Sequence, residues 1–198
     1  IFIDQYFFKT KGKNSNTRGK EYDHEMYNDR IICVDVATGF IKVFHQTSLR
    51  ASYILRSKHA VNHIVREHLI TIKKYHGDNG IFQSSDWISD CELEEHGYEF
   101  SGVGTQHQNG VAERAIGTIT RWSRCMILHS ALHWPSQADS SVWPFAMTYA
   151  TWLFNKLPHW KTGYSPEELF TRVKSNHVEL NRARIWGSPL YILGPKLH

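Results

Sequence analysis

Three acidic residues lie at positions that a metal site could use. Asp4 lies inside the apolar run IFIDQY, Asp78 follows a predicted strand in YHGDNG, and Glu113 lies in the first turn of a predicted helix. An Asp is unfavourable in a strand and costly to bury without a partner. Each residue also has a purely local explanation: a fraying chain end for Asp4, a simple turn for Asp78 and the helix dipole for Glu113.

Together the three carboxylates predict a metal site. Buried or half-buried like charges repel and cannot all stay ionised alone, whereas a divalent cation removes the conflict. Hard oxygen ligands of this kind suit Mg²⁺ or Mn²⁺. We therefore expect Asp4, Asp78 and Glu113 to converge on a divalent cation.

A second group of polar residues surrounds Glu113. The stretch His107, Gln108, Asn109 and Gly110 is a polar approach to the predicted helix, and the helix itself offers Arg114, Arg121 and Arg124. The three arginines lie roughly on one side of the helix, away from its apolar stripe. Phosphate binding is one interpretation of this side, and a solvated polar surface is the other.

The rest of the chain predicts alternating strands and helices. Strands are expected where β-branched and aromatic residues cluster, and helices where apolar residues recur every three to four positions. The expected strands cover residues 1–8, 30–38, 39–47, 69–78, 98–104 and part of 184–193, and the expected helices cover 48–68, 85–95, 110–129, 143–157 and 165–170. This order predicts a mixed α/β fold around a central sheet, antiparallel in its first part and parallel later.

Local signals mark several ends of these elements. Ser48 is expected to cap the first helix, Gly97 to stop the second, and Ser165 with Pro166 to start the last. Residues 9–29 lack periodicity and are expected to form a long exposed loop, basic in its first half and acidic in its second. A solvated flexible loop and a phosphate-contacting arm are both compatible with this composition.

Composition narrows the class of protein. The chain has 198 residues, 41% of them hydrophobic and 21% charged, with a net charge of +4, which predicts a folded domain and suits a polyanionic partner. Cys33, Cys91 and Cys125 are too scattered for a disulfide framework or a cysteine zinc site. We expect no membrane partner, since no apolar run approaches the roughly 20 residues that a membrane span needs. The opening inside an apparent strand suggests a piece of a longer protein.

The segments HGDNGIF and GTQHQNGVAERAIGTI resemble the integrase catalytic core of copia-type (Ty1/copia) LTR retrotransposons, within the retroviral-integrase-like superfamily. The pairing of an Asp-Asn-Gly turn with a QNGVAER helix start is far more specific than either segment alone. VDVATGFIKVF matches the hairpin that follows the first acidic residue of the family, so the resemblance assigns Asp4 as the first ligand and Asp35 as a non-ligand. In related integrases the positions one and two turns after the helix Glu are often lysines, whereas here they are Gly117 and Thr120.

The resemblance implies an RNase H-like fold, a five-stranded mixed sheet flanked by helices on both faces. It implies a catalytic core at residues 1–165 and a C-terminal extension at 166–198. The implied activity is DNA integration: trimming of retrotransposon DNA 3′ ends and their joining to target DNA, with two Mg²⁺ or Mn²⁺ ions. Asp4 would bridge both ions, Asp78 would complete one site and Glu113 the other. The implied partners are DNA and further copies of the chain, in the nucleus or in a cytoplasmic retrotransposon particle of a eukaryotic host.

Two other functions stay open on the sequence. One is an RNase H-like nuclease that hydrolyses DNA or RNA without joining. The other is a catalytically inactive DNA-binding relic that has kept the fold. A zinc site at His59 and His63, which are four residues apart, lacks an evident third ligand.

Overall fold

A five-stranded mixed sheet forms the centre of the computed structural model, which describes residues 1–15, 20, 22–102 and 109–189. The strand order is β3-β2-β1-β4-β5. β1 pairs antiparallel with β2, and β2 with β3, whereas β4 and β5 run parallel to β1. The strands are β1 (Phe2–Gly12), β2 (Tyr27–Val34), β3 (Ile41–Gln46), β4 (Lys74–Gly77) and β5 (Gly97–Phe100). The mixed sheet with an antiparallel first part, predicted from the sequence, is confirmed.

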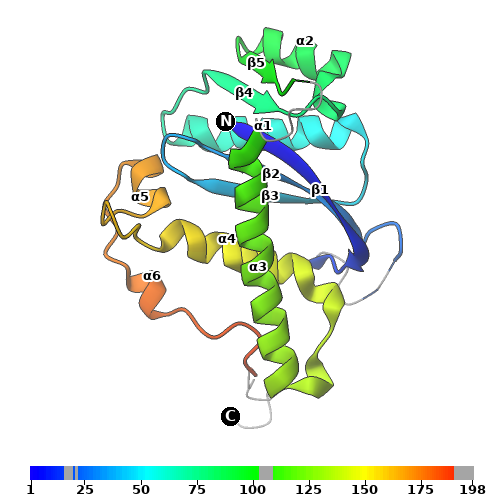
Figure 1. Cartoon of the computed structure of the whole chain (residues 1–198), viewed down its shortest axis with the longest axis vertical. Coiled ribbons are helices and arrows are strands. Elements are labelled where there is room, and N and C mark those ends of the chain that lie inside the picture. The colour runs from blue at the N-terminus through cyan, green and yellow to red at the C-terminus, as the bar shows by residue number, and fades with distance from the viewer. Residues whose placement is uncertain (16–19, 21, 103–108, 190–198) are drawn as a thin grey trace, which may run out of the picture.

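Helices cover both faces of this sheet. In Figure 1, α3 crosses in front of the strands with α4 below them, and α1 lies behind. Short 3-10 turns at Ile81–Gln83, Pro135–Gln137 and Ser140–Val142 connect the elements. The helices are α1 (Ala51–Glu67), α2 (Ser85–Leu93), α3 (Gly110–His133), α4 (Trp143–Lys156), α5 (Pro166–Thr171) and α6 (Val178–Asn181).

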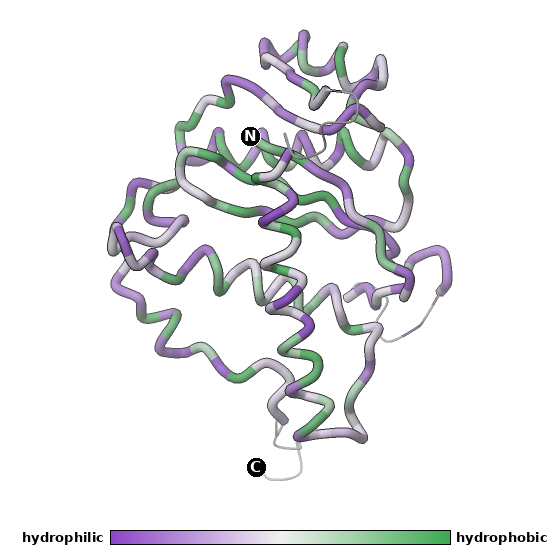
Figure 2. The backbone as a smooth tube through the Cα atoms, in the orientation of Figure 1, coloured by the Kyte–Doolittle hydropathy of each residue, from purple (hydrophilic) through white to green (hydrophobic). Residues whose placement is uncertain are grey.

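Two hydrophobic cores lie on opposite faces of the sheet because side chains alternate along each strand. Along β2, Ile31 and Cys33 point to one core, and Ile32 and Val34 point to the other. We call them the α1 core and the α3 core. The α1 core contains Ile3, Ile31, Cys33, Ile54, Val61, Val65, Ile72, Tyr75, Phe82, Trp87, Cys91 and Phe170. The α3 core contains Ile32, Val34, Ile41, Ala112, Ala115, Ile116, Ile119, Trp143, Met147 and Ala150. Hydrophilic and hydrophobic residues are interspersed along the strands and α3 in Figure 2, as expected for elements that face both a core and solvent.

The expected loop at residues 9–29 was wrong at both ends, because β1 continues to Gly12 and β2 begins at Tyr27. Contacts with the segment before α4 hold this extension. The indole of Trp143 donates to the carbonyl of Thr10 at 2.9 Å, and Lys13 N donates to Ser141 O at 2.7 Å. A Cβ on Gly12 would lie only 2.4 Å from Pro144 Cγ, so this close approach requires glycine. Arg18 and Glu21, which also belong to the expected loop, lie outside the described residues.

Several predicted helix ends differ from the structure. Arg50, not Ser48, is the cap residue of α1, and Ser48 Oγ instead accepts from Arg50 N at 3.4 Å. The left-handed residue after α2 is Glu95, at φ 56°, and Gly97 begins β5. The predicted start of α5 is confirmed, since Ser165 and Glu168 form a reciprocal capping box there.

The carboxyl-terminal part contains a turn where a strand was expected. Residues 184–189 form no strand, and residues 190–193 lie outside the described part of the chain. Phe170 of α5 stacks on Phe40 with ring centroids 4.2 Å apart and belongs to the α1 core. The division into a core at 1–165 and an extension at 166–198 stays a prediction. Among the described residues, no helix is long and apolar enough to span a membrane.

Candidate metal site and nucleic-acid interface

The three predicted carboxylates, from three different elements, line one open cavity of about 720 Å³. Asp4 is the third residue of β1, Asp78 directly follows β4, and Glu113 lies in the first turn of α3. Six further residues line the same cavity: Tyr6, Asn109, Ile116, Gly117, Thr120 and Arg121. The structure therefore brings together the acidic residues that the sequence singled out.

Strand register explains why Asp4 and Asp78 share this cavity. Phe2 of β1 pairs with His76 of β4 in a parallel register. Asp4 lies two residues after Phe2, and Asp78 lies two residues after His76. Neighbouring strands lie about 4.7–4.9 Å apart, which places the two backbones side by side. Asp78 Oδ1 accepts from Gly80 N at 3.2 Å, a turn that holds the carboxylate at the end of the strand.

Asn109 connects the third carboxylate to the first. It is the cap residue of α3, is only 1% exposed, and its Nδ2 donates to the carbonyl of Ile3 at 3.2 Å. Ile3 precedes Asp4, so this hydrogen bond fixes the start of α3, and with it Glu113, against the strand that carries Asp4. The sequence predicted a DNA-contacting role for Asn109, and the structure shows a buried residue that joins two elements.

The pKa of Asp4 reflects its burial and the repulsion between the three carboxylates. The pKa of Asp4 is raised to about 6, mainly by burial and also by the nearby carboxylates of Asp78 and Glu113. The Gln5 N–H, which donates to Asp4 Oδ1 at 2.8 Å, acts in the opposite direction. Asp78 and Glu113 are exposed. None of the three forms an ion pair with a lysine, arginine or histidine of the described chain. Among the described residues, their negative charge is therefore not neutralised by an ion pair.

The donor set of this cavity fits a hard divalent cation. Carboxylate oxygens are the ligands that Mg²⁺ and Mn²⁺ prefer. Asn109 Oδ1, a further hard oxygen, is buried without a hydrogen-bond partner and belongs to the same cavity lining. No three His, Cys, Asp or Glu side chains of the described ranges are already close enough to hold one ion. Asp4, Asp78 and Glu113 thus share a cavity, but the three carboxylates are not all within the distance at which they could bind one ion.

The predicted DNA-contacting residues are only partly gathered at this cavity. Arg121 lines it, whereas Arg124 is exposed outside its lining. Arg114 bends back over the start of α3, with Nη1 3.2 Å from the position that a Cβ on Gly110 would take. His107 and Gln108 lie outside the described residues.

The sequence reasoning missed three residues at or beneath the cavity. Tyr6 and Thr120 line it, and the guanidinium of Arg30 contacts both from below. Arg30 opens an apolar strand, a position that usually faces solvent, so no sequence signal marked it. Asp35, which the resemblance excluded as a ligand, lies outside the cavity lining and accepts from the backbone and hydroxyl of Thr38, which closes the β2–β3 turn.

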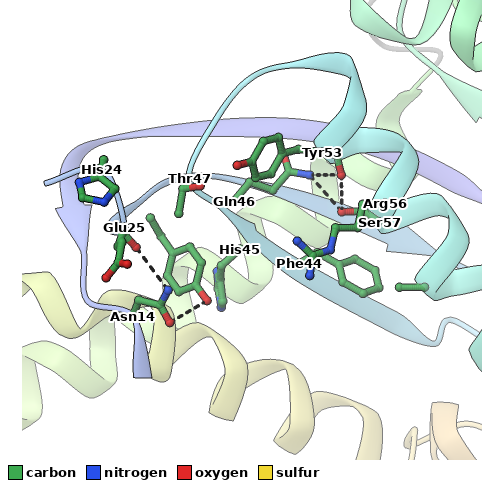
Figure 3. A pocket seen from close by; sticks show the side chains of 12 residues that line it. Asn14, His24, Glu25, Phe44, His45, Gln46, Thr47, Tyr53, Arg56 and Ser57 are labelled. Carbon is green, nitrogen blue, oxygen red and sulfur yellow. Dashed lines mark hydrogen bonds between the residues drawn. The ribbon is translucent and has the colours of Figure 1, made fainter. Parts of the chain in front are cut away.

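A second cavity, of about 570 Å³, lies between the end of the β2–β3 hairpin and α1 (Figure 3). Its polar side chains largely bind one another: Asn14 Nδ2 donates to Glu25 O, and Gln46 Nε2 donates to Tyr53 O and Ser57 Oγ. Glu25 is the only carboxylate in its described lining. This cavity therefore lacks the charge needed for a divalent metal site.

Comparison with known proteins identifies the fold. No protein-family model matches the chain. The simian T-cell lymphotropic virus intasome, solved in complex with PP2A regulatory subunit B56 gamma, has a similar chain at TM-score 0.59 and 16% identity, covering 98% of this chain. The present chain spans only 58% of that chain's length. The HTLV-2 integrase catalytic core domain in complex with magnesium is similar at TM-score 0.55 in its trimeric form and 0.54 in its dimeric form.

Both HTLV-2 comparisons have 16% identity and cover 85% of this chain, and they cover 95% and 94% of the HTLV-2 chains. At this level of identity the similarity defines the architecture. The chain has the RNase H-like fold of retroviral integrase catalytic cores, as the sequence resemblance implied.

Proposed function

We propose that this chain is the catalytic core of an integrase of the copia-type LTR retrotransposons and that it acts on DNA as a metal-dependent polynucleotidyl transferase. The observation that carries the proposal is the single cavity lined by Asp4, Asp78 and Glu113 on an integrase-like fold. The motif pair HGDNG and QNGVAER supports the copia-type assignment.

The proposed residue roles follow from the elements that carry them. Asp4 lies near the start of β1, the central strand of the sheet, and would contribute to both ion sites, with Asp78 completing one site and Glu113 the other. A pair of divalent ions supplies charge stabilisation for the attacking and leaving oxygens and lowers the pKa of a bound water. Asn109 keeps Glu113 aligned with Asp4 through Ile3, and Arg121 offers a cation to a DNA phosphate. No side-chain nucleophile is needed, because water attacks in end trimming and a DNA 3′-hydroxyl attacks in joining.

The partners and location follow from the same proposal. The donor would be the ends of the retrotransposon DNA, and the acceptor would be target DNA in the nucleus. Assembly would begin in a cytoplasmic particle and involve further copies of the chain. The trimeric and dimeric forms of the HTLV-2 core support an oligomer.

Substituting Asp78→Asn tests the enzymatic proposal, with Asp86→Asn on the exposed start of α2 as the matched control. With Mg²⁺ and a labelled donor duplex, Asp78→Asn should lose cleavage and joining by more than the roughly 10- to 100-fold typical of outer-shell residues. Asp86→Asn should retain both activities. Equal activity of Asp78→Asn and the unmodified chain would contradict the proposal.

The same assay separates the alternative functions. Product lengths distinguish trimmed donor ends from donor strands joined to target DNA. Cleavage without joining would support the nuclease. DNA binding without Mg²⁺-dependent chemistry would support the inactive relic.

A further inference from the structure

Arg30 is a buried cation directly beneath the acidic cavity. It is 0% exposed, and its guanidinium carbon lies 4.0 Å from the ring centroid of Phe8 and 4.4 Å from that of Tyr6. Its Nη2 donates to Thr120 Oγ1 at 3.0 Å. Its Nε and Nη1 have no hydrogen-bond partner in the described structure. The side chain therefore connects β2 to α3, and two of its nitrogens, Nε and Nη1, have no described acceptor.

No carboxylate of the described residues forms an ion pair with Arg30. Burial lowers the pKa of Arg30 to about 9, which leaves the group protonated at neutral pH. Asp29 is adjacent in sequence, but its Oδ2 accepts from Gln5 Nε2, and no ion pair joins it to Arg30. An isolated buried charge is expensive, and the aromatic faces of Tyr6 and Phe8 offset only part of that cost. Among the described residues, the guanidinium therefore binds one polar side chain, the hydroxyl of Thr120.

Thr120 connects this buried charge to the cavity. Its hydroxyl oxygen accepts from Arg30, and the described chain offers its hydroxyl hydrogen no acceptor. Thr120 lines the cavity together with Asp4 and Glu113, so its hydrogen is free to donate into that space. A hydroxyl that accepts from a cation becomes a better donor, because consecutive hydrogen bonds polarise one another.

We propose that Arg30 and Thr120 form a relay that binds a phosphate of DNA beside the metal site. Thr120 donates to a non-bridging oxygen of a phosphodiester next to the scissile one, and Arg30 is the positioning residue that orients and polarises the hydroxyl. Tyr6 covers the guanidinium and completes the cavity wall. The relay rests on the proposed function, because it assigns the cavity to DNA.

DNA binding in the absence of metal tests the relay apart from catalysis. The probe is a fluorescent duplex with a recessed end, titrated with the full chain in EDTA and followed by anisotropy. Thr120→Val removes the hydroxyl at constant shape and should weaken binding about 10-fold or more, the effect of losing one hydrogen bond to a charged group. Thr120→Ser should bind within about 2-fold of the unmodified chain, since it keeps the hydroxyl. Thr118→Val, on the same helix but outside the cavity lining, is the matched control and should bind normally.

Coupling between the two residues tests the positioning role. Arg30→Lys keeps the charge but loses the planar fork, so it should weaken DNA binding to about the same extent as Thr120→Val. The double variant should bind no more weakly than either single variant, because both remove one relay. Thermal midpoints identify any variant that is simply unfolded. Thr120→Val removes the hydroxyl that accepts from the buried guanidinium and should lower the midpoint, so DNA binding is compared below the midpoint of each variant.

Each contrary result has a separate meaning. Normal binding by Thr120→Val, equal loss in Thr118→Val, or fully additive losses in the double variant would overturn the relay and leave the proposed function standing. Failure of the unmodified chain to bind any duplex would contradict the proposed function itself, and the relay with it.

Discussion

The side-chain amide of Asn109 donates to the backbone carbonyl of Ile3 at 3.2 Å, across an interval of 106 residues. We predict that Asn109→Ala lowers the free energy of unfolding by about 1–2 kcal/mol, because a buried carbonyl loses its donor. It should also weaken Mn²⁺ binding about 10-fold, as is usual for a residue that orients ligands. Chemical denaturation and calorimetric titration with Mn²⁺ measure the two effects.

Asn155 offers a matched control for Asn109. This buried amide bonds both the carbonyl and the N–H of Ile41, at 2.7 Å and 3.0 Å, far from the carboxylates. Asn155→Ala should destabilise the fold at least as strongly and leave the Mn²⁺ affinity of the folded protein unchanged. Equal losses of Mn²⁺ affinity in the two variants would show that Asn109 has no special role in aligning the site.

Asp4 should make stability depend on pH in metal-free buffer. Its pKa is raised to about 6 in the folded protein, mainly by burial, from an ordinary value of 3.8. The folded state therefore holds the proton more tightly, and the resulting stabilisation is complete below about pH 4 and lost as pH rises through about 6. Asp4→Asn should remove this contribution, about 3 kcal/mol at most, from unfolding curves recorded between pH 4 and 7.5.

Asp29 must be separated from this effect, since burial raises its pKa to about 6 as well. Asp29→Asn should change the same pH profile but leave metal binding intact, because Asp29 lies outside the cavity lining.

Mn²⁺ binding by the unmodified chain should weaken about 4-fold between pH 7.5 and 5.5, as Asp4 takes up its proton. A pH-independent Mn²⁺ affinity would remove Asp4 from the ligand set.

Gly117 lies in the middle of α3, and an added Cβ there would meet no atom within 4 Å. Gly117→Ala should therefore raise the free energy of unfolding by about 0.5–1 kcal/mol, because alanine favours the helix. Gly117→Lys should also tighten DNA binding, since the new cation would extend over the cavity. Gly117→Gln, of similar length and neutral, is the control. If Gln and Lys bind DNA equally well in anisotropy titrations, DNA does not approach this side of α3.

Arg121 and Arg124 differ in their relation to the cavity, since only Arg121 lines it. Arg121→Ala should weaken DNA binding at low salt and reduce the slope of log affinity against log salt concentration by about 1. Arg124→Ala should have a smaller effect on both quantities. The reverse order in salt-dependent titrations would place the DNA along the outer half of α3, away from the carboxylates.

The sequence predicted most of the secondary structure because local signals determine most of it. A β-rich apolar run on either side of a Thr-Gly turn identifies β2 and β3, and Ser165 followed by Pro166 identifies the start of α5. The extension of β1 was missed because Trp143 and Ser141, which hold it, lie about 130 residues away along the chain. No local pattern reveals such a contact.

In the candidate site too, some residues could be identified from the sequence and others only from contacts in the tertiary structure. Motif spacing identified Asp4, Asp78 and Glu113, and the fold places them around one cavity. Arg30 was missed because its burial depends on aromatic residues of β1 and a hydroxyl of α3, which only the tertiary structure brings together. The sequence predicted that Asn109 contacts DNA. Its hydrogen bond to Ile3 could not be predicted, because the sequence does not show that the start of α3 lies against β1.

The carboxylates are anchored in different halves of the molecule. The turn with Asp78 is followed by Phe82, a member of the α1 core, whereas Glu113 lies between Ala112 and Ala115 of the α3 core. A cation shared by all three acids would act as a clamp across the sheet, so that neither half could open locally without losing a ligand. Occupancy by metal should then slow amide hydrogen exchange on both sides of the sheet at once, far beyond the residues that touch the ion.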